Sequence, residues 1–237
     1  MKLGEDMETI ERYFFLLLFA PDSSGSYSQP IRGNTWLQKE MFILSKLDSQ
    51  LAEDADFDAY SMGAYSDTVA EIQDQFVISG YIDVEKGGTE LTKLTLEGRK
   101  EAERVWGNAG EQERKVVSLV KSWLNDLTFN ELLAVVYAEY PESASKSSVK
   151  GQVDARAHEL AVSLLRKNKV SSDLAQRISG LNADQFEKML KSRGLTGREL
   201  ESEHIVMDAG LMEDLRRSYE DSRHRRLVAW EKMSLSP

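Results

Sequence analysis

Apolar residues recur at helical spacing at the start of the chain. In residues 7–20 they form one stripe, at Met7, Ile10, Phe14, Leu17 and Leu18. This spacing predicts an amphipathic helix with one buried side. Residues 21–33 are rich in Ser, Gly and Pro, which predicts a loop. A second helix is expected from about Thr35 onward, and its apolar side consists of Leu37, Met41, Leu44, Leu47 and Leu51. The acidic residues 53–58 are expected to form a loop after it.

A third helix is predicted to begin at residue 66. Ser66 is a typical N-cap residue, because its hydroxyl can accept a hydrogen bond from a free backbone N–H of the first turn. The residues expected to face inward are Val69, Ile72 and Phe76. Gly80 is a typical residue at a helix end, so the helix is expected to stop there.

The period of the pattern changes after this helix. Residues 81–84 alternate as a strand does, residues 86–88 supply turn residues, and residues 89–95 predict a second strand. From Gly98 to Trp106 the pattern is helical again. Three helices, a two-stranded hairpin and a further helix are the element order of a winged helix.

The second half of the chain is predicted to be entirely helical. Helices are expected at residues 116–124, at 154–167 and, with Asn182 as cap, at 182–194. Thr128 and Glu131 form a capping-box signature for a helix that ends before Pro141, and Thr196 and Glu199 form another. The apolar residues of a long closing helix are Met212, Leu215, Tyr219, Leu227 and Trp230.

Two domains are therefore predicted in a mainly α protein. The first, residues 1–142, is a winged helix of three helices and a two-stranded wing, extended by further helices. The second, residues 149–237, is all-helical. Residues 143–148 are polar and form the predicted linker.

Three stretches resemble one protein family. Residues 35–42, Thr-Trp-Leu-Gln-Lys-Glu-Met-Phe, are similar to the second helix of Panacea-type (SocA-like) antitoxin domains and related prokaryotic winged-helix proteins. Residues 60–66 resemble the turn by which those proteins enter their third helix, with Ala64 in place of the usual proline. Residues 81–82 and 94–99 resemble the end of that helix and the exit from the wing. The likeness covers about residues 8–140 and implies a regulatory or antitoxin-like protein, with no enzymatic activity to carry over.

Composition indicates the compartment. The chain of 237 residues is 41% hydrophobic and 30% charged, which is typical of a globular protein. It has no cysteine, which excludes disulfides and thiolate metal sites and fits a reducing cytoplasm. The longest apolar run, residues 14–20, is too short to span a membrane, and acidic residues precede it, unlike a signal peptide. We therefore expect a cytoplasmic protein with no membrane association.

The net charge of −10 originates in the first half of the chain. Residues 1–106 hold 10 Lys and Arg against 20 Asp and Glu, whereas residues 107–237 hold 20 of each. Proteins bind the phosphate backbone of DNA mainly through Lys and Arg. An acidic winged helix is therefore poorly suited to DNA.

Single residues of the predicted third helix also argue against DNA binding. A winged helix normally presents basic or amide side chains from this helix to the major groove. Here the helix offers Asp67, Glu71 and Asp74 with Gln75, and no basic residue. These four residues are the predicted partner-binding site, and the expected partner is a protein.

A rival nucleic-acid surface lies in the second half. Arg166, Lys167 and Lys169 form a basic cluster without acidic neighbours in the sequence. The arginines of the closing helix are instead expected to be neutralised by acids four residues away. These pairs are Glu213–Arg217, Arg216–Glu220 and Asp221–Arg225.

Histidine offers little catalytic chemistry in this chain. His158 is expected to be partly buried on its helix. Glu201 with His204 and Asp221 with His224 have the three-residue spacing used in di-iron bundles, but their charged surroundings predict exposed side chains and no metal. No phosphate-binding glycine loop and no nucleophile motif is present. We expect no catalytic residue and no cofactor.

These observations predict a non-catalytic regulatory protein that binds another protein through a winged-helix scaffold. The resemblance adds an antitoxin-like or defence-associated role. The alternatives are a DNA-binding winged-helix transcription regulator and, in another class, a metal-dependent helical enzyme. A homodimer is compatible with either binding function.

Overall fold

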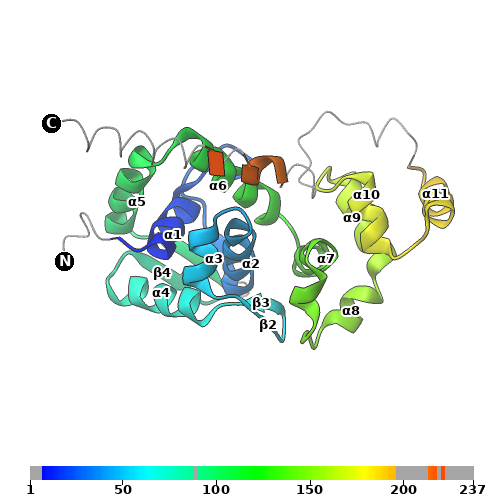
Figure 1. Cartoon of the computed structure of the whole chain (residues 1–237), viewed down its shortest axis with the longest axis horizontal. Helices are drawn as coiled ribbons and strands as arrows, with labels where there is room; N and C mark the ends of the chain where they lie inside the picture. Colours follow the sequence, from blue (N-terminus) through cyan, green and yellow to red (C-terminus); the bar gives the residue numbers. More distant parts are fainter. Residues whose placement is uncertain (1–6, 88–89, 196–212, 218–219, 222–237) are drawn as a thin grey trace. The chain divides into compact units, whose positions relative to one another are not determined.

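The computed structural model describes residues 7–87, 90–195, 213–217 and 220–221. In these residues the protein is mainly helical with small antiparallel sheets, which confirms the predicted class (Figure 1). The chain forms two compact units. Unit 1 comprises Met1–Asp56, Ser66–Asn125 and Met212–Pro237, and unit 2 comprises Phe57–Tyr65 and Asp126–Leu211. The linker predicted at residues 143–148 lies inside unit 2.

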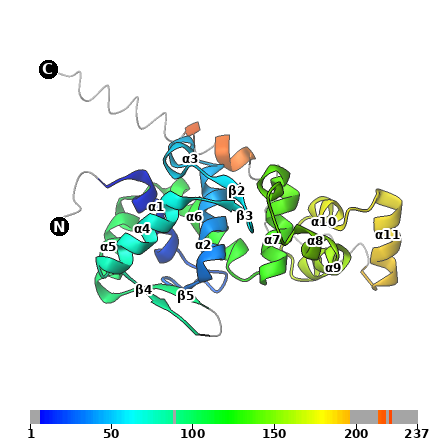
Figure 2. The same cartoon turned by 90° about the horizontal axis from the view of Figure 1, so that it is seen from below.

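Unit 1 surrounds a central apolar helix. Its helices are α1 (Thr9–Phe19), α2 (Gly33–Ser45), α3 (Ser49–Ala55), α4 (Asp67–Ile78), α5 (Leu96–Asn108) and α6 (Glu111–Leu124). Residues 13–20, in α1 and directly after it, are all buried, and α1 packs against α3, α5 and α6 (Figure 2). The apolar run at residues 14–20 is thus the core of this unit.

A three-stranded sheet completes unit 1. Its strands are β1 (Ile31–Arg32), β4 (Ile82–Glu85) and β5 (Leu91–Leu94), in the order β1-β5-β4. Thr92 of the central strand pairs with Ile31 on one side and with Val84 on the other, both antiparallel. The two strands predicted at residues 81–84 and 89–95 are therefore confirmed as β4 and β5, with residues 88–89 between them outside the described part.

The predicted loop at residues 21–33 ends earlier than expected, because it contains strand β1. The Asn125 side chain donates a hydrogen bond to the Pro30 carbonyl oxygen over 2.9 Å and accepts one from the Arg32 backbone N–H over 3.3 Å. These bonds and the pairing with β5 come from residues far along the chain. Local sequence therefore could not indicate the strand.

The single helix expected from Thr35 through Leu51 is two helices, α2 and α3. The carboxylate of Asp48 accepts hydrogen bonds from the backbone N–H groups of Gln50 (2.8 Å) and Leu51 (3.3 Å). The Tyr13 hydroxyl donates to the same carboxylate over 2.9 Å. An aspartate held in this way is an N-cap, so it starts a new helix instead of continuing the old one. Since α3 extends to Ala55, the acidic residues 53–58 are also not entirely a loop.

The junction between β5 and α5 depends on close backbone contact. Thr95 caps α5, accepting from the Gly98 backbone N–H over 3.0 Å, and its hydroxyl donates to the Gly80 carbonyl oxygen over 2.6 Å. A Cβ atom on Gly98 would overlap the carbonyl oxygen of Tyr81. The glycine of the motif at residues 94–99 is thus required because two backbone segments touch there.

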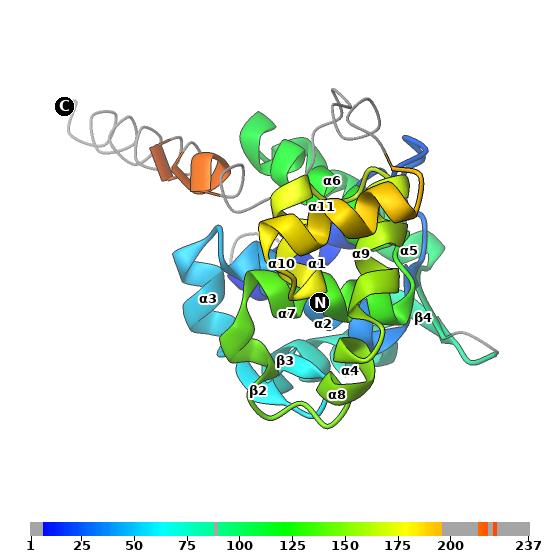
Figure 3. The same cartoon turned by 90° about the vertical axis from the view of Figure 1, so that its right-hand side faces the viewer.

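Unit 2 combines a short hairpin with a group of helices. The hairpin is β2 (Asp58–Tyr60) and β3 (Gly63–Tyr65), and the helices are α7 (Phe129–Glu139), the 3₁₀ helix η1 (Pro141–Ala144), α8 (Lys150–Asp154), α9 (Ala157–Arg166), α10 (Ser172–Ser179) and α11 (Ala183–Ser192). Helix α10 packs against both α7 and α9, as Figure 3 shows. The hairpin contacts η1, and the Ser148 backbone N–H donates to the Ser61 carbonyl oxygen over 3.0 Å.

Two helices of unit 2, α8 and α10, were not predicted from the sequence. The helix expected at residues 154–167 is confirmed as α9, which begins at Ala157, and its Leu160, Leu164 and Leu165 are buried as predicted. The short helix α8 lies before it, in residues where no helix was expected. Helix α10 was not predicted, because only three of its eight residues have apolar side chains that reach the core. These are Leu174, Ala175 and Ile178. The caps at Thr128 and Asn182 are confirmed.

The closing helix lies mostly outside the described residues. Its described part, 213–217 and 220–221, is helical, and Leu215 is buried. Glu213 pairs with Arg217 over 3.0 Å and Arg216 with Glu220 over 2.9 Å, as predicted. The Asp221–Arg225 pair, the capping box at Thr196 and Glu199, and His204 and His224 fall outside the described part.

Candidate protein-docking surface

Helix α4 is positioned by buried hydrogen bonds at its N-terminus. The Ser66 hydroxyl accepts from the Val69 backbone N–H over 3.0 Å and donates to the Ala55 carbonyl oxygen. The Gln38 amide, buried on α2, bonds the same residue twice: its oxygen accepts from the Ser66 backbone N–H over 2.9 Å, and its nitrogen donates to the Ser66 carbonyl over 3.0 Å. The start of α4 is therefore anchored to α2 and α3.

One side of α4 is anchored in the core. Val69, Ile72 and Phe76 are buried as the sequence predicts. The Phe76 ring lies 4.5 Å from that of Phe15, measured between ring centroids. Gln73 is buried too, and its amide donates to the Thr92 hydroxyl over 3.2 Å. The N-terminus and the inner side of α4 are thus fixed, which leaves a rigid outer side.

The outer side of α4 is acidic. Asp67, Glu71, Asp74 and Gln75 are all exposed, so the fold brings the four predicted partner-binding residues onto one face. Asp67 and Glu71 are four residues apart, Glu71 and Asp74 three, and Glu71 and Gln75 four, which is the spacing of neighbours on a helix surface. None of the three carboxylates forms an ion pair with a residue in the described part of the chain.

The acidic face ends in exposed apolar side chains that were not predicted from the sequence. Ile78 is 86% exposed, and Val77, beside it, is 42% exposed. Leu96, at the start of α5, is 76% exposed. The bond between the Thr95 hydroxyl and the Gly80 carbonyl holds the start of α5 beside the end of α4. A signal was present in the sequence, since Ile78 lies out of phase with the buried positions 69, 72 and 76.

The strands after α4 contribute little positive charge. Lys86 is exposed at the tip, while Lys93 on β5 forms an ion pair with Glu85 on β4. This pair is exposed and cross-strand, so it neutralises the second cation of the hairpin. In the described residues of this hairpin, Lys86 alone remains without an acidic partner.

The basic cluster of unit 2 differs from the prediction. Lys167 pairs with Glu131 over 2.7 Å, and Lys169 pairs with Asp126 over 3.2 Å. Arg166 donates a hydrogen bond to the Arg193 carbonyl oxygen over 3.0 Å. The expectation that this cluster lacks acidic partners is wrong, because Glu131 on α7 and Asp126 just before α7 are carboxylates distant in sequence. Two of its three charges are neutralised within unit 2.

Glu131 is the centre of this network. It is buried and accepts from the Thr128 backbone N–H and hydroxyl, both over 2.9 Å, and from the Ser163 hydroxyl over 2.7 Å. Burial alone would raise the pKa of Glu131, but the hydrogen bonds from Lys167, Thr128 and Ser163 outweigh it and lower the pKa to about 2. The predicted capping residue thus also joins α7 to α9.

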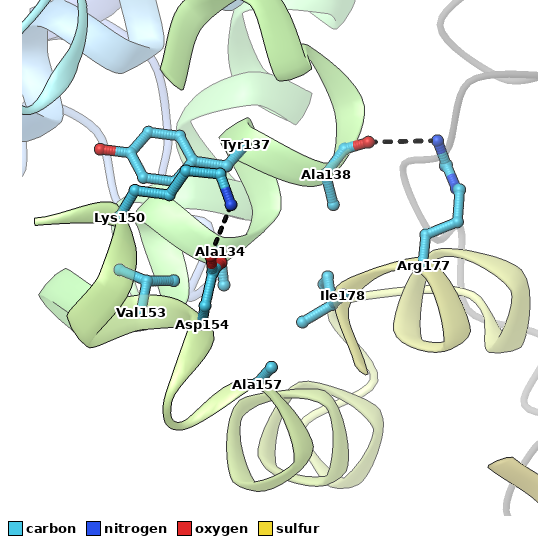
Figure 4. A pocket seen from close by; sticks show the side chains of 9 residues that line it. All are labelled: Ala134, Tyr137, Ala138, Lys150, Val153, Asp154, Ala157, Arg177 and Ile178. Atoms are coloured by element: carbon cyan, nitrogen blue, oxygen red, sulfur yellow. Dashed lines mark hydrogen bonds and ion pairs between the residues drawn. The ribbon is translucent and has the colours of Figure 1, made fainter. Parts of the chain in front are cut away.

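A small cavity lies among α7, α8, α9 and α10 in unit 2. Its volume is about 120 Å³, and Figure 4 shows its side chains. Apolar side chains line its interior: Ala134, Ala138, Val153, Ala157 and Ile178. Lys150 and Asp154 form an ion pair at one rim over 2.5 Å, and Arg177 at the other bonds the Ala138 carbonyl. Its cations are thus engaged by the protein itself.

Two lysines of unit 1 are buried and do not lie on the outer face of α4. Lys39 on α2 is 2% exposed, and burial lowers its pKa to about 7. Lys121 on α6 donates to the Leu18 carbonyl oxygen over 2.9 Å at the end of α1. Burial lowers the pKa of Lys121 to about 8, against the opposing influence of Glu40 and Asp22. Both lysines act inside the core and do not contribute positive surface.

The histidine prediction is corrected at one position. His158 is exposed rather than partly buried, because it lies in the first turn of α9, before the buried residues that begin at Leu160. Within residues 7–87 and 90–195 and the short described C-terminal turns, no three His, Asp or Glu side chains are grouped to hold a metal ion. The same residues contain no helix both long and apolar enough to cross a bilayer.

Comparison with protein-family models, curated proteins and solved structures finds no match. The resemblance to SocA-like antitoxin domains therefore stays a prediction based on the short motifs. The candidate site rests on geometry and charge: an anchored helix with an acidic outer face and an apolar end.

Proposed function

We propose that this chain is a non-catalytic regulatory protein that binds another protein through the outer face of α4. In this proposal unit 1 is a winged helix, and its third core helix, α4, is used for protein docking instead of base reading. The role is antitoxin-like or defence-associated, as the motif resemblance suggests.

The arrangement of unit 1 supports the winged-helix part. The order α1, β1, α2, α4, β4, β5 is helix, strand, helix, helix and a two-stranded wing. The sheet order β1-β5-β4 places the first short strand beside the last one, as a wing requires. Helix α3 and the hairpin β2–β3 are then an insertion before the third core helix.

The acidic face of α4 is the observation that carries the docking proposal. Asp67, Glu71 and Asp74 lie together on a rigid helix, no base in the described part of the chain pairs with them, and Val77 and Ile78 follow them. Bare carboxylates repel phosphates, whereas they attract the basic groups of a protein partner. An exposed Ile at the end of the helix supplies apolar area, which protein interfaces use at their centres.

The DNA-binding alternative assigns DNA contact, instead of protein contact, to the same helix. It requires α4 to approach phosphates, with Lys86 as the unpaired cation among the described wing residues. The basic residues Arg166, Lys167 and Lys169 offer it little support, since two of them are already paired with acids. We therefore keep DNA binding as the alternative that the experiment tests.

The test removes the three negative charges of the outer face of α4 in the full-length protein. In the triple variant Asp67→Asn, Glu71→Gln, Asp74→Asn, we expect capture of a specific protein from the native cell to be lost. Binding to random duplex DNA and to the protein's own promoter should remain undetectable near physiological salt, before and after the change. Affinity capture with mass spectrometry and a DNA titration measure the two properties.

A matched variant controls for net charge. Asp83→Asn, Glu103→Gln and Glu111→Gln remove three exposed acids of unit 1 outside α4, and Glu111 lies in a first helical turn as Asp67 does. We expect this variant to capture the same partner as the unmodified protein. Salt-sensitive, submicromolar binding of the unmodified chain to its promoter would instead favour the transcription regulator.

A further inference from the structure

The outer face of α4 has a complementary counterpart in the sequence of the same chain. Residues 223–230 read Arg-His-Arg-Arg-Leu-Val-Ala-Trp. They contain three arginines followed by apolar residues, whereas α4 presents three carboxylates followed by Val77 and Ile78. One surface is acidic and then apolar, and the other segment is basic and then apolar.

The arginines differ in how far their own helix neutralises them. Arg216 and Arg217 are paired with Glu213 and Glu220. Arg226 has no acidic residue three or four positions before or after it in the sequence, and Arg223 has only Glu220, three positions before it, which pairs with Arg216. They are therefore the cations of this segment that i, i+4 pairing leaves available.

The spacing of the two patterns agrees. On the helix that the sequence predicts here, Arg223, Arg226, Leu227 and Trp230 share one face, at positions i, i+3, i+4 and i+7. On α4, Glu71, Asp74, Gln75 and Ile78 have the same offsets. Each set spans about 10 Å at the helical rise of about 1.5 Å per residue. A parallel alignment thus sets Arg223 against Glu71, Arg226 against Asp74 and Trp230 against Ile78.

We assign the two patterns to different copies of the chain. The described turns at residues 213–217 stand apart from α4 in each view, although both belong to unit 1 (Figures 1–3). Arg223 follows Asp221 by two residues, a span of at most about 7 Å. Leu215 is buried, which holds in place the turns at residues 213–217 that precede Asp221. A second copy is not subject to this restriction, and two copies can exchange segments about one twofold axis.

We infer that residues 223–230 of a second copy dock on the outer face of α4, forming a reciprocal homodimer that covers the proposed partner site. The contact comprises Arg–carboxylate pairs followed by Trp230 against Ile78, Val77 and Leu96. The inference rests on the proposed function only in that α4 is a docking face. Because the same face then serves both contacts, the external partner has to displace the second copy.

Charge exchange between full-length variants tests the inference. Variant A carries Glu71→Arg and Asp74→Arg, and variant B carries Arg223→Glu and Arg226→Glu. We expect the unmodified protein to be a dimer at low salt by size-exclusion chromatography with light scattering, and each variant alone to be a monomer. An equimolar mixture of A and B should form a heterodimer, since both exchanged contacts are then again between opposite charges.

Two further variants keep the result interpretable. Lys115→Glu with Lys188→Glu changes the charge as variant B does, at exposed sites outside the contact, and should leave the dimer intact. Trp230→Ala should raise the dimer dissociation constant about tenfold or more, because aromatic anchors dominate such contacts. Circular dichroism of A and B confirms that each variant remains folded.

A monomeric unmodified protein, or a mixture of A and B that stays monomeric, overturns the inference. The proposed function fails separately, when the Asp67, Glu71 and Asp74 neutralisation leaves capture of the cellular protein unchanged. If the mixture stays monomeric while that capture is lost, α4 binds an external partner but not the second copy. If the heterodimer forms and no cellular protein depends on α4, the face serves self-association.

Discussion

The Gln38 amide on α2 forms two hydrogen bonds with the backbone of Ser66, one to its N–H and one to its carbonyl. Both residues are buried, and Ser66 is the residue that caps α4. The side chain of one helix thus satisfies the backbone at the start of another. This relationship sets where α4 begins and therefore which of its residues face outward.

Replacement of Gln38 by Ala should destabilise unit 1 by about 2–4 kcal/mol, because the buried N–H and C=O groups of Ser66 lose their partners. Urea unfolding followed by circular dichroism measures the change. Gln75→Ala, an exposed amide on α4, is the matched control and should cost less than about 0.5 kcal/mol. Equal effects of the two substitutions would contradict the role assigned to Gln38.

Replacement of Gly98 by Ala should destabilise the protein by more than about 2 kcal/mol, because the new Cβ overlaps the Tyr81 carbonyl oxygen and must push α5 away from it. Gly107→Ala lies in the same helix, where a Cβ meets nothing within 4 Å. That control should stabilise the protein by about 0.5–1 kcal/mol. Thermal unfolding of the two variants gives opposite signs if this packing is correct.

Burial lowers the pKa of Lys39 to about 7, below its ordinary value of 10.5, so its effect on stability depends on pH. Above about pH 7 the folded chain releases a proton that the unfolded chain keeps until about pH 10. The unfolding free energy of the unmodified protein should therefore rise relative to Lys39→Met across this window, by up to about 1.4 kcal/mol per pH unit. Urea titrations of both proteins measure it, with the exposed Lys115→Met as control. A difference that falls with rising pH would refute the assignment.

The pKa of Glu131 is lowered to about 2, so its contribution has the opposite pH dependence. The stabilisation is present above about pH 4.5, the ordinary value, and is lost as pH falls toward about pH 2. At neutral pH, Glu131→Gln should cost about 2–4 kcal/mol, since Lys167 and Ser163 lose a charged acceptor. The cost should shrink in acid. Glu103→Gln, on the exposed side of α5, is the control in the same unfolding assay.

Limited proteolysis tests the domain boundary. The predicted linker contains Lys146, but Ser143 and Ala144 are buried in η1 and the Ser148 N–H bonds the Ser61 carbonyl. We expect trypsin to cleave after Lys86, exposed at the tip of the β4–β5 hairpin, well before it cleaves after Lys146. Mass spectrometry of the fragments decides. Early accumulation of a fragment ending at Lys146 would support the boundary at residues 143–148 instead.

Local patterns were sufficient where one segment carried its own signals. The stripe from Ile10 to Leu18 predicts α1, Ser66 and Gly80 bound α4, and Thr128 with Glu131 starts α7. Each signal depends on residues within about one or two helical turns, so it can be recognised without the fold. The acidic outer face of α4 belongs to the same group, because a helix's phase sets which residues share a side.

Only the tertiary structure decided the features that depend on distant residues. Strand β1 exists because β5 and Asn125 pair with it, and the break before α3 depends on Tyr13 reaching Asp48. The carboxylates that neutralise Lys167 and Lys169 are Glu131 on α7 and Asp126 just before it, far along the chain. Hydrogen bonds and ion pairs act over a few ångströms in space, whatever the separation in sequence. The pattern along the chain thus determined helices such as α1, α4 and α7 and the charged face, and the packing of unit 1 and of unit 2 decided which charges remain available.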